Sequence, residues 1–468
     1  MINWSNNLPD IKPKYLAIIQ LIKTLIQNNE LIPGQRLPSE RSLARWFSVD
    51  RSTVNRALSE LAAQGIIFKK MGSGTFIAET PTLKPQTISI NWQSLLEPVT
   101  TQADNIEDQL MQARILNKGE LIDGAADELP ADLIPDIGTF EFDWEKHLEN
   151  HKYASTGYQP LIDTLGQHPQ MKQNIDLAQQ TIMVSGGAAQ SLLLVLSSLL
   201  STGDAVAFTT PSYFNATAVF QTLNIRTFGV PLNNSNFDID QLEDTIIKHR
   251  IKLLIMNPTF ENPTGETLTL SQRKRILSVC QQYQVAVVED DVFGWLSTTK
   301  ADVPTLKELA PTNVIYISSM SKLLGKGTRI GWIIAPQAIG QHLLQVQSKL
   351  DMIPSMLAQE MVNMVLNRKN FLPELNELTA TLEKRRNAVA EIFRKYRPDW
   401  QFAIPAGGFY LWVTQSEGDI FNQLLEKNIL VKPGGIYGAD RFSFRFNVAR
   451  MNEARLQELG ERLAEKKA

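Results

Sequence analysis

The chain has 468 residues, more than a single domain usually contains, so two or three domains are expected. Apolar residues make up 43% and charged residues 20% of it, which excludes collagen-like and disordered chains and is typical of a globular protein. The single cysteine, Cys280, excludes an intrachain disulfide and, with no signal segment in view, favours a reducing cytoplasm.

The net charge of -3 hides an asymmetry between the two ends of the chain. Residues 1–80 carry ten Lys and Arg against six Asp and Glu, whereas the remainder carries 36 against 43. A basic first part suits a nucleic-acid partner, although an incidental surface imbalance explains four charges equally well.

Three helices are predicted in this first part. Apolar residues at helical spacing over 15–26 indicate the first. Ser39 and Asp50 are typical N-caps for the second and third, and Gly65 ends the third. The third begins with Arg, Ser, Thr and Asn after a tight turn, which is the build of a helix-turn-helix that reads a major groove. The segment IIFKKMGSGTFIA then predicts a hairpin, or wing, with two lysines at its base.

For Ser39 and Asp50 taken singly, capping is a better explanation than DNA contact, because helix caps are polar in any small domain. The whole order of helices and wing favours DNA binding. The segments PGQRLPSERSLARWFSVDRSTVNRALSELAAQG and GSGTF resemble the GntR-type winged-helix regulators over nearly all of residues 12–78. The resemblance implies contacts with operator DNA by Arg41, Arg51, Thr53 and Asn55. Ser52 at the start of the third helix and Lys69, Gly72, Ser73 and Gly74 of the wing are further candidates, because a wing could approach phosphates or the minor groove.

The pattern weakens from residue 79 to about 93, where we place an interdomain linker. Beyond it, apolar strand-like runs alternate with helical stretches. The runs are TIMV, DAVAFT, IRTFGV, IKLLIM, VAVVE, VIYIS and RIGWII. This order predicts an α/β body with a mainly parallel sheet covered by helices, whose ligands bind at the carboxyl ends of strands. The longest apolar run, 192–200, is too short to cross a bilayer, so no membrane partner is expected.

The stretch VIYISSMSKLLGKGTRIGW is the strongest chemical signal. A buried strand delivers Ser319, Ser321 and Lys322 to one point, and Arg329 follows seven positions later. A lysine that forms a Schiff base needs a carbonyl partner, and nearby serines and an arginine suit a phosphate. Pyridoxal phosphate (PLP) has both groups.

Polar and turn residues follow the other strands too. Small residues in SGGAAQS open a helix whose amides suit a phosphate. Tyr213 could stack on a cofactor ring, Asn262 could donate from a turn, and Asp290 could pair with a protonated pyridine nitrogen. Taken singly, each is better explained as a core, turn or surface residue.

Together the motifs GAAQ, ENPTG, EDD, SMSK and FRFNVARM resemble fold-type-I aminotransferases over roughly residues 115–468. The resemblance implies a Schiff base on Lys322, a pyridinium partner in Asp290, a ring-hydroxyl partner in Asn262 and a stacking ring in Tyr213. It implies a carboxylate clamp in Arg445. It also implies that the cofactor's phosphate is held by Ala188, Ala189, Ser319, Ser321 and Arg329. Gly187, directly before the helix that SGGAAQS opens, is a further candidate for cofactor binding.

The chain departs from this family after Asp290. The family supplies a tyrosine two or three residues later, where this chain has Val292 and Phe293, neither of which donates a hydrogen bond. Lys326 stands where related regulators often have proline, and we expect it to face solvent. His147 and His151 share a helix spacing but lack the rest of a zinc motif, so no metal is expected.

A winged helix-turn-helix joined to an aminotransferase-like body resembles the MocR subfamily of GntR regulators. It implies a transcription factor that senses a small amine, an amino acid or PLP itself, and a head-to-tail homodimer. A working aminotransferase that carries a DNA-binding domain is the alternative, and a body that has lost its cofactor is a third. The expected divisions are 1–78 (winged helix), 79–114 (linker and connecting segment), 115–335 (PLP-binding large domain) and 336–468 (small domain).

Overall fold

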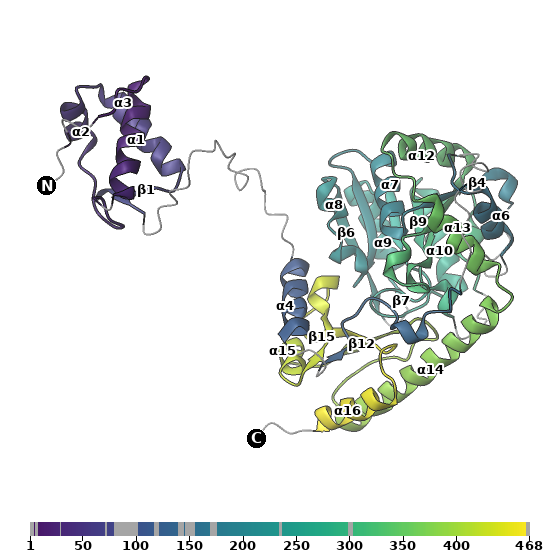
Figure 1. The fold of residues 1–468 in the computed structure, drawn as a ribbon. Coiled ribbons are helices and arrows are strands. Elements are labelled where there is room, and N and C mark those ends of the chain that lie inside the picture. Colours follow the sequence, from purple (N-terminus) through teal and green to yellow (C-terminus); the bar gives the residue numbers. More distant parts are fainter. Residues whose placement is uncertain are drawn as a thin grey trace. The chain divides into compact units, whose positions relative to one another are not determined.

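The computed structural model describes residues 4, 8–28, 30–70, 73–78, 102–116, 121–138, 145, 155–168, 176–233, 236–297 and 303–464. Its internal contacts divide the chain into two compact units, residues 1–98 and 99–468, which we call the head and the body (Figure 1). The predicted linker over 79–93, Gly72 and the pair His147 and His151 lie outside the described residues.

The head contains the three predicted helices and the predicted hairpin. They are α1 (Lys14–Gln27), α2 (Glu40–Phe47), α3 (Arg51–Ala63), β1 (Ile67–Lys70) and β2 (Gly74–Ile77). The side chain of Ser39 caps α2 by accepting from the amide of Ser42 (3.1 Å). Asp50 stands at the N-cap of α3 but its exposed side chain makes no capping hydrogen bond, so that part of the prediction is wrong. The turn between α2 and α3 is made by Ser48 in a left-handed conformation (φ 49°).

The body is built around an eight-stranded, mainly parallel sheet in the order β4-β11-β10-β9-β8-β5-β6-β7. The strands are β4 (Gln180–Ser185), β5 (Ala205–Thr210), β6 (Arg226–Asn233), β7 (Asn236–Phe237), β8 (Leu253–Met256), β9 (Ala286–Asp290), β10 (Val314–Ser319) and β11 (Gly331–Pro336). The pairs within β10-β9-β8-β5-β6 are parallel, and β11 runs against both β10 and β4. All seven apolar runs therefore form strands of one sheet.

Helices pack on this sheet and on the smaller C-terminal part of the body. They are α4 (Gln102–Leu116), α6 (Gln159–Gln167), α7 (Ala188–Leu199), α8 (Val219–Thr222), α9 (Ile239–His249), α10 (Leu270–Gln282), α11 (Leu306–Leu309), α12 (Gln337–Lys349), α13 (Met356–Leu366), α14 (Phe371–Tyr396), α15 (Ile420–Leu425) and α16 (Glu453–Ala464). None of these, nor any other helix among the described residues, has the length and apolar composition needed to cross a membrane.

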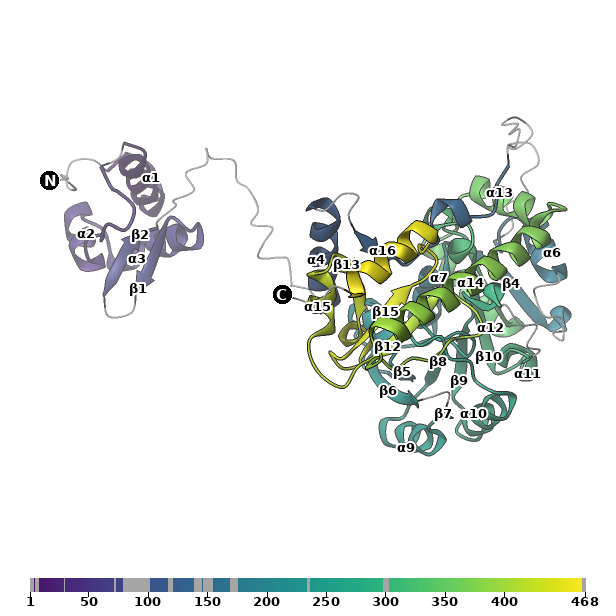
Figure 2. The same cartoon turned by 90° about the horizontal axis from the view of Figure 1, so that it is seen from below.

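The uninterrupted apolar runs place apolar side chains on both faces of the sheet, because successive side chains of a strand point to opposite sides. On β5, Val206 and Phe208 join the core under α7 and α12, whereas Ala205 and Ala207 join the core under α9 and α10. Helices α9 and α10 lie side by side in Figure 2. Cys280 of α10 is buried in that second core, and burial raises the pKa of its thiol to about 12.

The C-terminal part adds a second, smaller sheet. Its strands are β12 (Tyr410–Thr414), β14 (Lys432–Pro433) and β15 (Ser443–Asn447), in the order β12-β15-β14. Helices α14 and α16 lie side by side (Figure 1) and share the largest core with it. A parallel pair joins β13 (Ile429–Leu430) to β3 (Ile122–Asp123), which brings the segment after β3 next to β15.

Candidate functional site

Several predicted residues meet at one edge of the large sheet. Strands β4, β9 and β10 run in the same direction, so their last residues, Ser185, Asp290 and Ser319, face one edge. Gly331, the first residue of β11, lies between these strands and pairs with both Ser185 and Ser319. A side chain at this glycine would collide with the Ser318 carbonyl at 2.7 Å.

Next to this edge, Gly187 precedes α7 with φ +98°, a conformation that favours glycine. A Cβ on Gly187 would lie 3.7 Å from Ser319 Oγ and 3.8 Å from Ser321 Oγ. The two hydroxyls are 3.1 Å apart. The amides of Ala188 and Ala189 belong to the first turn of α7, whose N–H groups have no partner within the helix. Helix start, glycine and two hydroxyls thus form a cradle suited to an anion.

Lys322 lies at the centre of the site. Its Nζ donates to the carbonyl of Asp127 (2.8 Å) and to the hydroxyl of Tyr410 (3.4 Å). The rings of Phe293, Phe409 and Tyr410 surround this amine, with centroids 5.2, 5.8 and 5.7 Å away. Burial among them lowers the pKa of Lys322 to about 8. A low pKa increases the neutral fraction of the amine, the form that attacks carbonyl groups.

Asp290 ends β9, the strand next to the one that Lys322 follows. Its Oδ1 is buried and has no hydrogen-bond partner among the described residues, and burial raises the pKa of the carboxyl to about 7. The backbone carbonyl of Asp290 accepts from Asn257 Nδ2 (2.8 Å), which fixes the end of the strand. Asn257 also forms a side-chain hydrogen bond with the Asp290 carboxyl, so Oδ1 is the oxygen that remains open to a donor from outside the chain.

Arg445 of β15 is 1% exposed and makes two polar contacts. Its Nη1 donates to Asn262 Oδ1 (2.9 Å), and its Nη2 donates to the carboxylate of Asp127. The guanidinium lies over the ring of Tyr410, 3.8 Å from the centroid. Asn262 therefore uses its oxygen for Arg445, which leaves the Nδ2 group as its donor.

Tyr213 follows β5 and is 37% exposed. Its amide donates to the carbonyl of Asn262 (2.6 Å), which ties the loops after β5 and β8 together. Partial burial raises the pKa of the Tyr213 hydroxyl, and the charges of Arg445 and Arg329 oppose that rise. Arg329 is exposed and adopts a left-handed conformation (φ 49°).

Glu261, beside Asn262, is a buried acid that the sequence analysis did not single out. Thr209 Oγ1 donates to its Oε2 (2.5 Å) and Ser212 Oγ donates to its Oε1 (3.0 Å). Burial raises the pKa of Glu261 to about 8. The carboxyl group thus anchors both loops that carry Tyr213 and Asn262.

Asp127, Tyr410 and Lys432 also belong to the site and were not predicted from the sequence. Lys432 of β14 donates to Asp127 Oδ2 (2.6 Å) and to the carboxylate of Glu107 on α4. Burial alone would raise the pKa of Asp127, but Arg445 and Lys432 hold it well below its usual range. No local motif marks these residues. One signal was available, because an arginine within the apolar strand FRFN requires a counter-charge.

The residues at the positions of the family's tyrosine pack in the core instead of donating. Phe293 is buried against Phe409 and Tyr410, and Val292 is half-buried. The hydroxyl nearest to Lys322 that the structure describes comes from Tyr410, on a strand of the smaller sheet. Lys326 is exposed, as expected.

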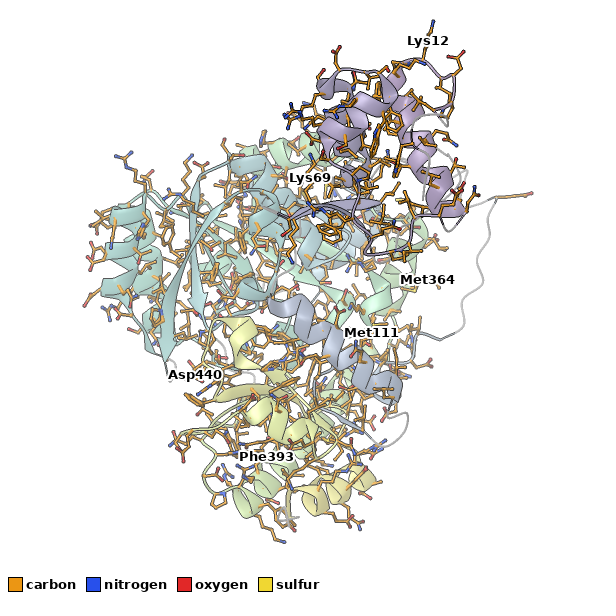
Figure 3. All side chains as sticks on the ribbon, turned by 90° about the vertical axis from the view of Figure 1, so that its left-hand side faces the viewer. Lys12, Lys69, Met111, Met364, Phe393 and Asp440 are labelled. Carbon is orange, nitrogen blue, oxygen red and sulfur yellow. The ribbon has the colours of Figure 1, made fainter. Side chains whose placement is uncertain are left out.

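In the head, the predicted DNA-contacting residues gather around Glu40. Its carboxylate accepts from Asn55 Nδ2 (3.1 Å), Lys69 Nζ (3.3 Å) and Arg51 Nε (3.4 Å). Burial by itself raises the pKa of Glu40, but the hydrogen bonds of Lys69 and Asn55 lower it below its usual value. These contacts join the start of α3 to β1, at the base of the wing. Lys12 lies at the opposite end of the head from Lys69 (Figure 3).

The other predicted contacts lie on the same elements. Arg41 and Ser52 are exposed, whereas Thr53 is half-buried. Ser73 and Gly74 form the described part of the wing tip. Gly74 has φ +120°, and a Cβ there would lie 2.7 Å from Arg36 Nε, so the wing requires glycine at this position.

Comparisons with known proteins agree with both units. Residues 14–77 match the gntR family of bacterial regulatory proteins, and residues 130–463 match the family of class I and II aminotransferases. HTH-type transcriptional regulator NorG of Staphylococcus aureus (strain USA300) is 31% identical over 429 residues, covering 88% of this chain and 95% of that protein. The uncharacterized HTH-type transcriptional regulator YdfD of Bacillus subtilis (strain 168) is 30% identical, covering 92% and 91%.

Solved structures show the fold of the body. The multiple substrate aminotransferase from Thermococcus profundus superposes with a TM-score of 0.71 at 22% identity, covering 80% of this chain and 98% of that one. Kynurenine aminotransferase of Pyrococcus horikoshii, solved in complex with PMP, gives 0.71 at 23% identity, covering 80% and 97%.

A winged helix-turn-helix joined to a body of aminotransferase fold defines a class of DNA-binding transcriptional regulators. The chain belongs to this class, the MocR subfamily of GntR-type regulators.

Proposed function

We propose that this regulator binds PLP in its body, senses a small amine or amino acid there, and changes the affinity of its head for operator DNA. The observation that carries the proposal is the buried Oδ1 of Asp290, which no described donor satisfies. A protonated pyridine nitrogen is a donor that fits a carboxylate ending a strand beside a reactive lysine. The raised pKa of Asp290, about 7, fits a group that gains its cationic partner only when the cofactor binds.

The other site residues fit the rest of the cofactor. The cradle formed by Gly187, Ser319, Ser321 and the start of α7 suits its phosphate, and the exposed Arg329 adds a positive charge. Tyr213 would stack on the ring and Asn262 Nδ2 would donate to the ring hydroxyl. When bound, PLP supplies an aldehyde that forms imines with primary amines.

Lys322 is suited to hold that aldehyde. With a pKa of about 8, about a quarter of its amine is neutral at pH 7.5, against about a thousandth for an ordinary lysine. Three aromatic rings lie beside the amine. An incoming amine competes with Lys322 for the same carbonyl carbon, and Arg445 would bind its carboxylate.

In the head, Arg51, Asn55 and Lys69 would contact operator DNA, positioned by Glu40. The response requires that the ligand-bound body favour one arrangement of head and body over another. We propose a head-to-tail homodimer as the assembly, on the strength of the family resemblance alone.

The test is the absorbance spectrum of the protein after incubation with PLP and removal of the excess. The wild type should show a near-visible band that shifts when an amine is added, and Lys322→Ala should lack it. Lys326→Ala, an exposed lysine four residues away, is the matched control and should keep the band. A band of equal intensity in Lys322→Ala would refute the proposal.

A further inference from the structure

Asp127 contacts both Lys322, the proposed Schiff-base lysine, and Arg445, the proposed carboxylate-binding residue. Its backbone carbonyl accepts from Lys322 Nζ (2.8 Å) and from the Tyr410 hydroxyl (3.2 Å). Its carboxylate bridges two cations, with Oδ1 on Arg445 Nη2 and Oδ2 on Lys432 Nζ. In this structure the carboxylate that Arg445 binds is therefore the chain's own.

The surroundings of Asp127 distinguish it from an ordinary structural ion pair. The side chains of Arg445 and Lys432 are 1% and 8% exposed, whereas the side chain of Asp127 is 41% exposed. The two cations are fixed in the protein, and the acid between them lies at the surface of the site. A carboxylate in that position can turn toward solvent and become hydrated, provided that another anion takes its place on the two buried cations.

From this geometry we infer that Asp127 is an internal competitor of the ligand's carboxylate. It occupies Arg445 and Lys432 until a ligand carboxylate displaces it. This inference rests on the proposed function and extends it, because it assigns Lys432 as a second cation that binds the ligand carboxylate. Asp127 then determines specificity: amines without a carboxylate leave it in place, and amino acids must exchange with it.

Charge balance supports this exchange. Arg445 and Lys432 face two acids, Asp127 and Glu107, so the four side chains are together neutral. A ligand carboxylate added to all four leaves an excess negative charge beside buried groups, which is unfavourable. Turning Asp127 outward restores neutrality, with the new carboxylate bridging the same two cations.

The test compares ligand binding in Asp127→Asn with that in the wild type, both loaded with PLP. The twenty common amino acids are titrated singly, and ethylamine, which is alanine without its carboxylate, serves as the probe that leaves Asp127 in place. Binding is followed by the shift of the near-visible band and by calorimetry. Asparagine keeps the backbone carbonyl that Lys322 uses and removes the competing charge.

We expect the amino acids that bind to do so at least about tenfold more tightly in Asp127→Asn, the usual scale of a charge-assisted hydrogen bond. The dissociation constant of ethylamine should change less than about twofold. Glu107→Gln is the matched control, since it removes the same charge from Lys432 but leaves Asp127 on Arg445, and it should tighten amino-acid binding clearly less than Asp127→Asn does.

Two results would overturn the inference. Unchanged or weaker amino-acid binding in Asp127→Asn would show that Asp127 does not compete with the ligand's carboxylate. Weaker ethylamine binding in Asp127→Asn would show that Asp127 binds the ligand's amino group instead. Lys432→Met provides an independent check if Asp127→Asn does not fold, and should weaken amino acids about tenfold while sparing ethylamine. If the PLP band of the wild type shifts with ethylamine, the proposed function stands even when the inference about Asp127 fails. If the wild type shows no PLP band, both the proposed function and the inference are refuted.

Discussion

Replacing Glu261 by glutamine should remove a pH-dependent loss of stability that the structure assigns to this residue. Glu261 is buried between Thr209 and Ser212, whose hydroxyls both donate to it. Burial disfavours the charged form and raises the pKa of the carboxyl to about 8, against 4.5 for an exposed glutamate. Glutamine has nearly the same shape and stays neutral at every pH.

The sign and size follow from this pKa difference. Between pH 4.5 and pH 8 the folded protein holds a proton on Glu261 that the unfolded chain has released, so stability falls as pH rises. With these two values, the contribution of Glu261 to the free energy of unfolding falls by about 3 to 4 kcal/mol between pH 5 and pH 8. Glu261→Gln should therefore be within about 1 kcal/mol of the wild type at pH 5 and about 3 kcal/mol more stable at pH 8.

The assay is urea unfolding of both proteins, followed by tryptophan fluorescence at pH 5, 6, 7 and 8. The difference between the two proteins isolates Glu261, because Asp290, Glu289 and Lys307, whose pKa values are also shifted, titrate in both. Glu417→Gln, at an exposed position, controls for the loss of one carboxylate. A difference that stays constant across pH, or a glutamine variant that is less stable at pH 8, would refute the reasoning.

Three further predictions concern function. Gly187→Val should weaken PLP binding about tenfold or more, because the new side chain enters the cradle beside Ser319 and Ser321 and Gly187 has a positive φ that valine disfavours. Equilibrium dialysis measures the dissociation constant of PLP. The control Gly327→Ala, which has open space around its Cβ, should leave that constant unchanged. Arg51→Ala should weaken operator binding at least about fivefold, whereas Lys12→Ala at the other end of the head should not. If Arg51 contacts a phosphate, the slope of log binding constant against log salt concentration should also fall by about one. Retained specific binding in Arg51→Ala would contradict the placement of the recognition helix. Transamination of any common amino acid should stay well below about one turnover per second, and ordinary enzymatic rates would favour a working aminotransferase.

The sequence predicted the parts of the site that follow strands. Lys322, Ser319 and Asp290 each come directly after an uninterrupted apolar run, and parallel strands bring their ends to one edge of the sheet. The helices and hairpin of the head were predictable for a similar reason, because caps, spacing and glycines are all local in sequence.

The other half of the site depends on contacts between distant segments. Asp127 reaches Arg445 because β3 pairs with β13, about 300 positions away, and both strands have only two residues. Such short strands leave no periodic pattern to detect. Tyr410 is likewise placed by the smaller sheet, and its approach to Lys322 depends on how that sheet packs on the large one.

The buried Cys280 makes the protein a convenient background for site-directed labelling. It is the only cysteine of the chain, and it lies on the buried face of α10. A thiol with a pKa of about 12 hardly reacts with maleimides at neutral pH. A fluorophore pair can therefore be attached through two new cysteines, one on the head and one on the body, without first removing a native thiol. Energy transfer between them would report directly whether an amine in the body moves the head.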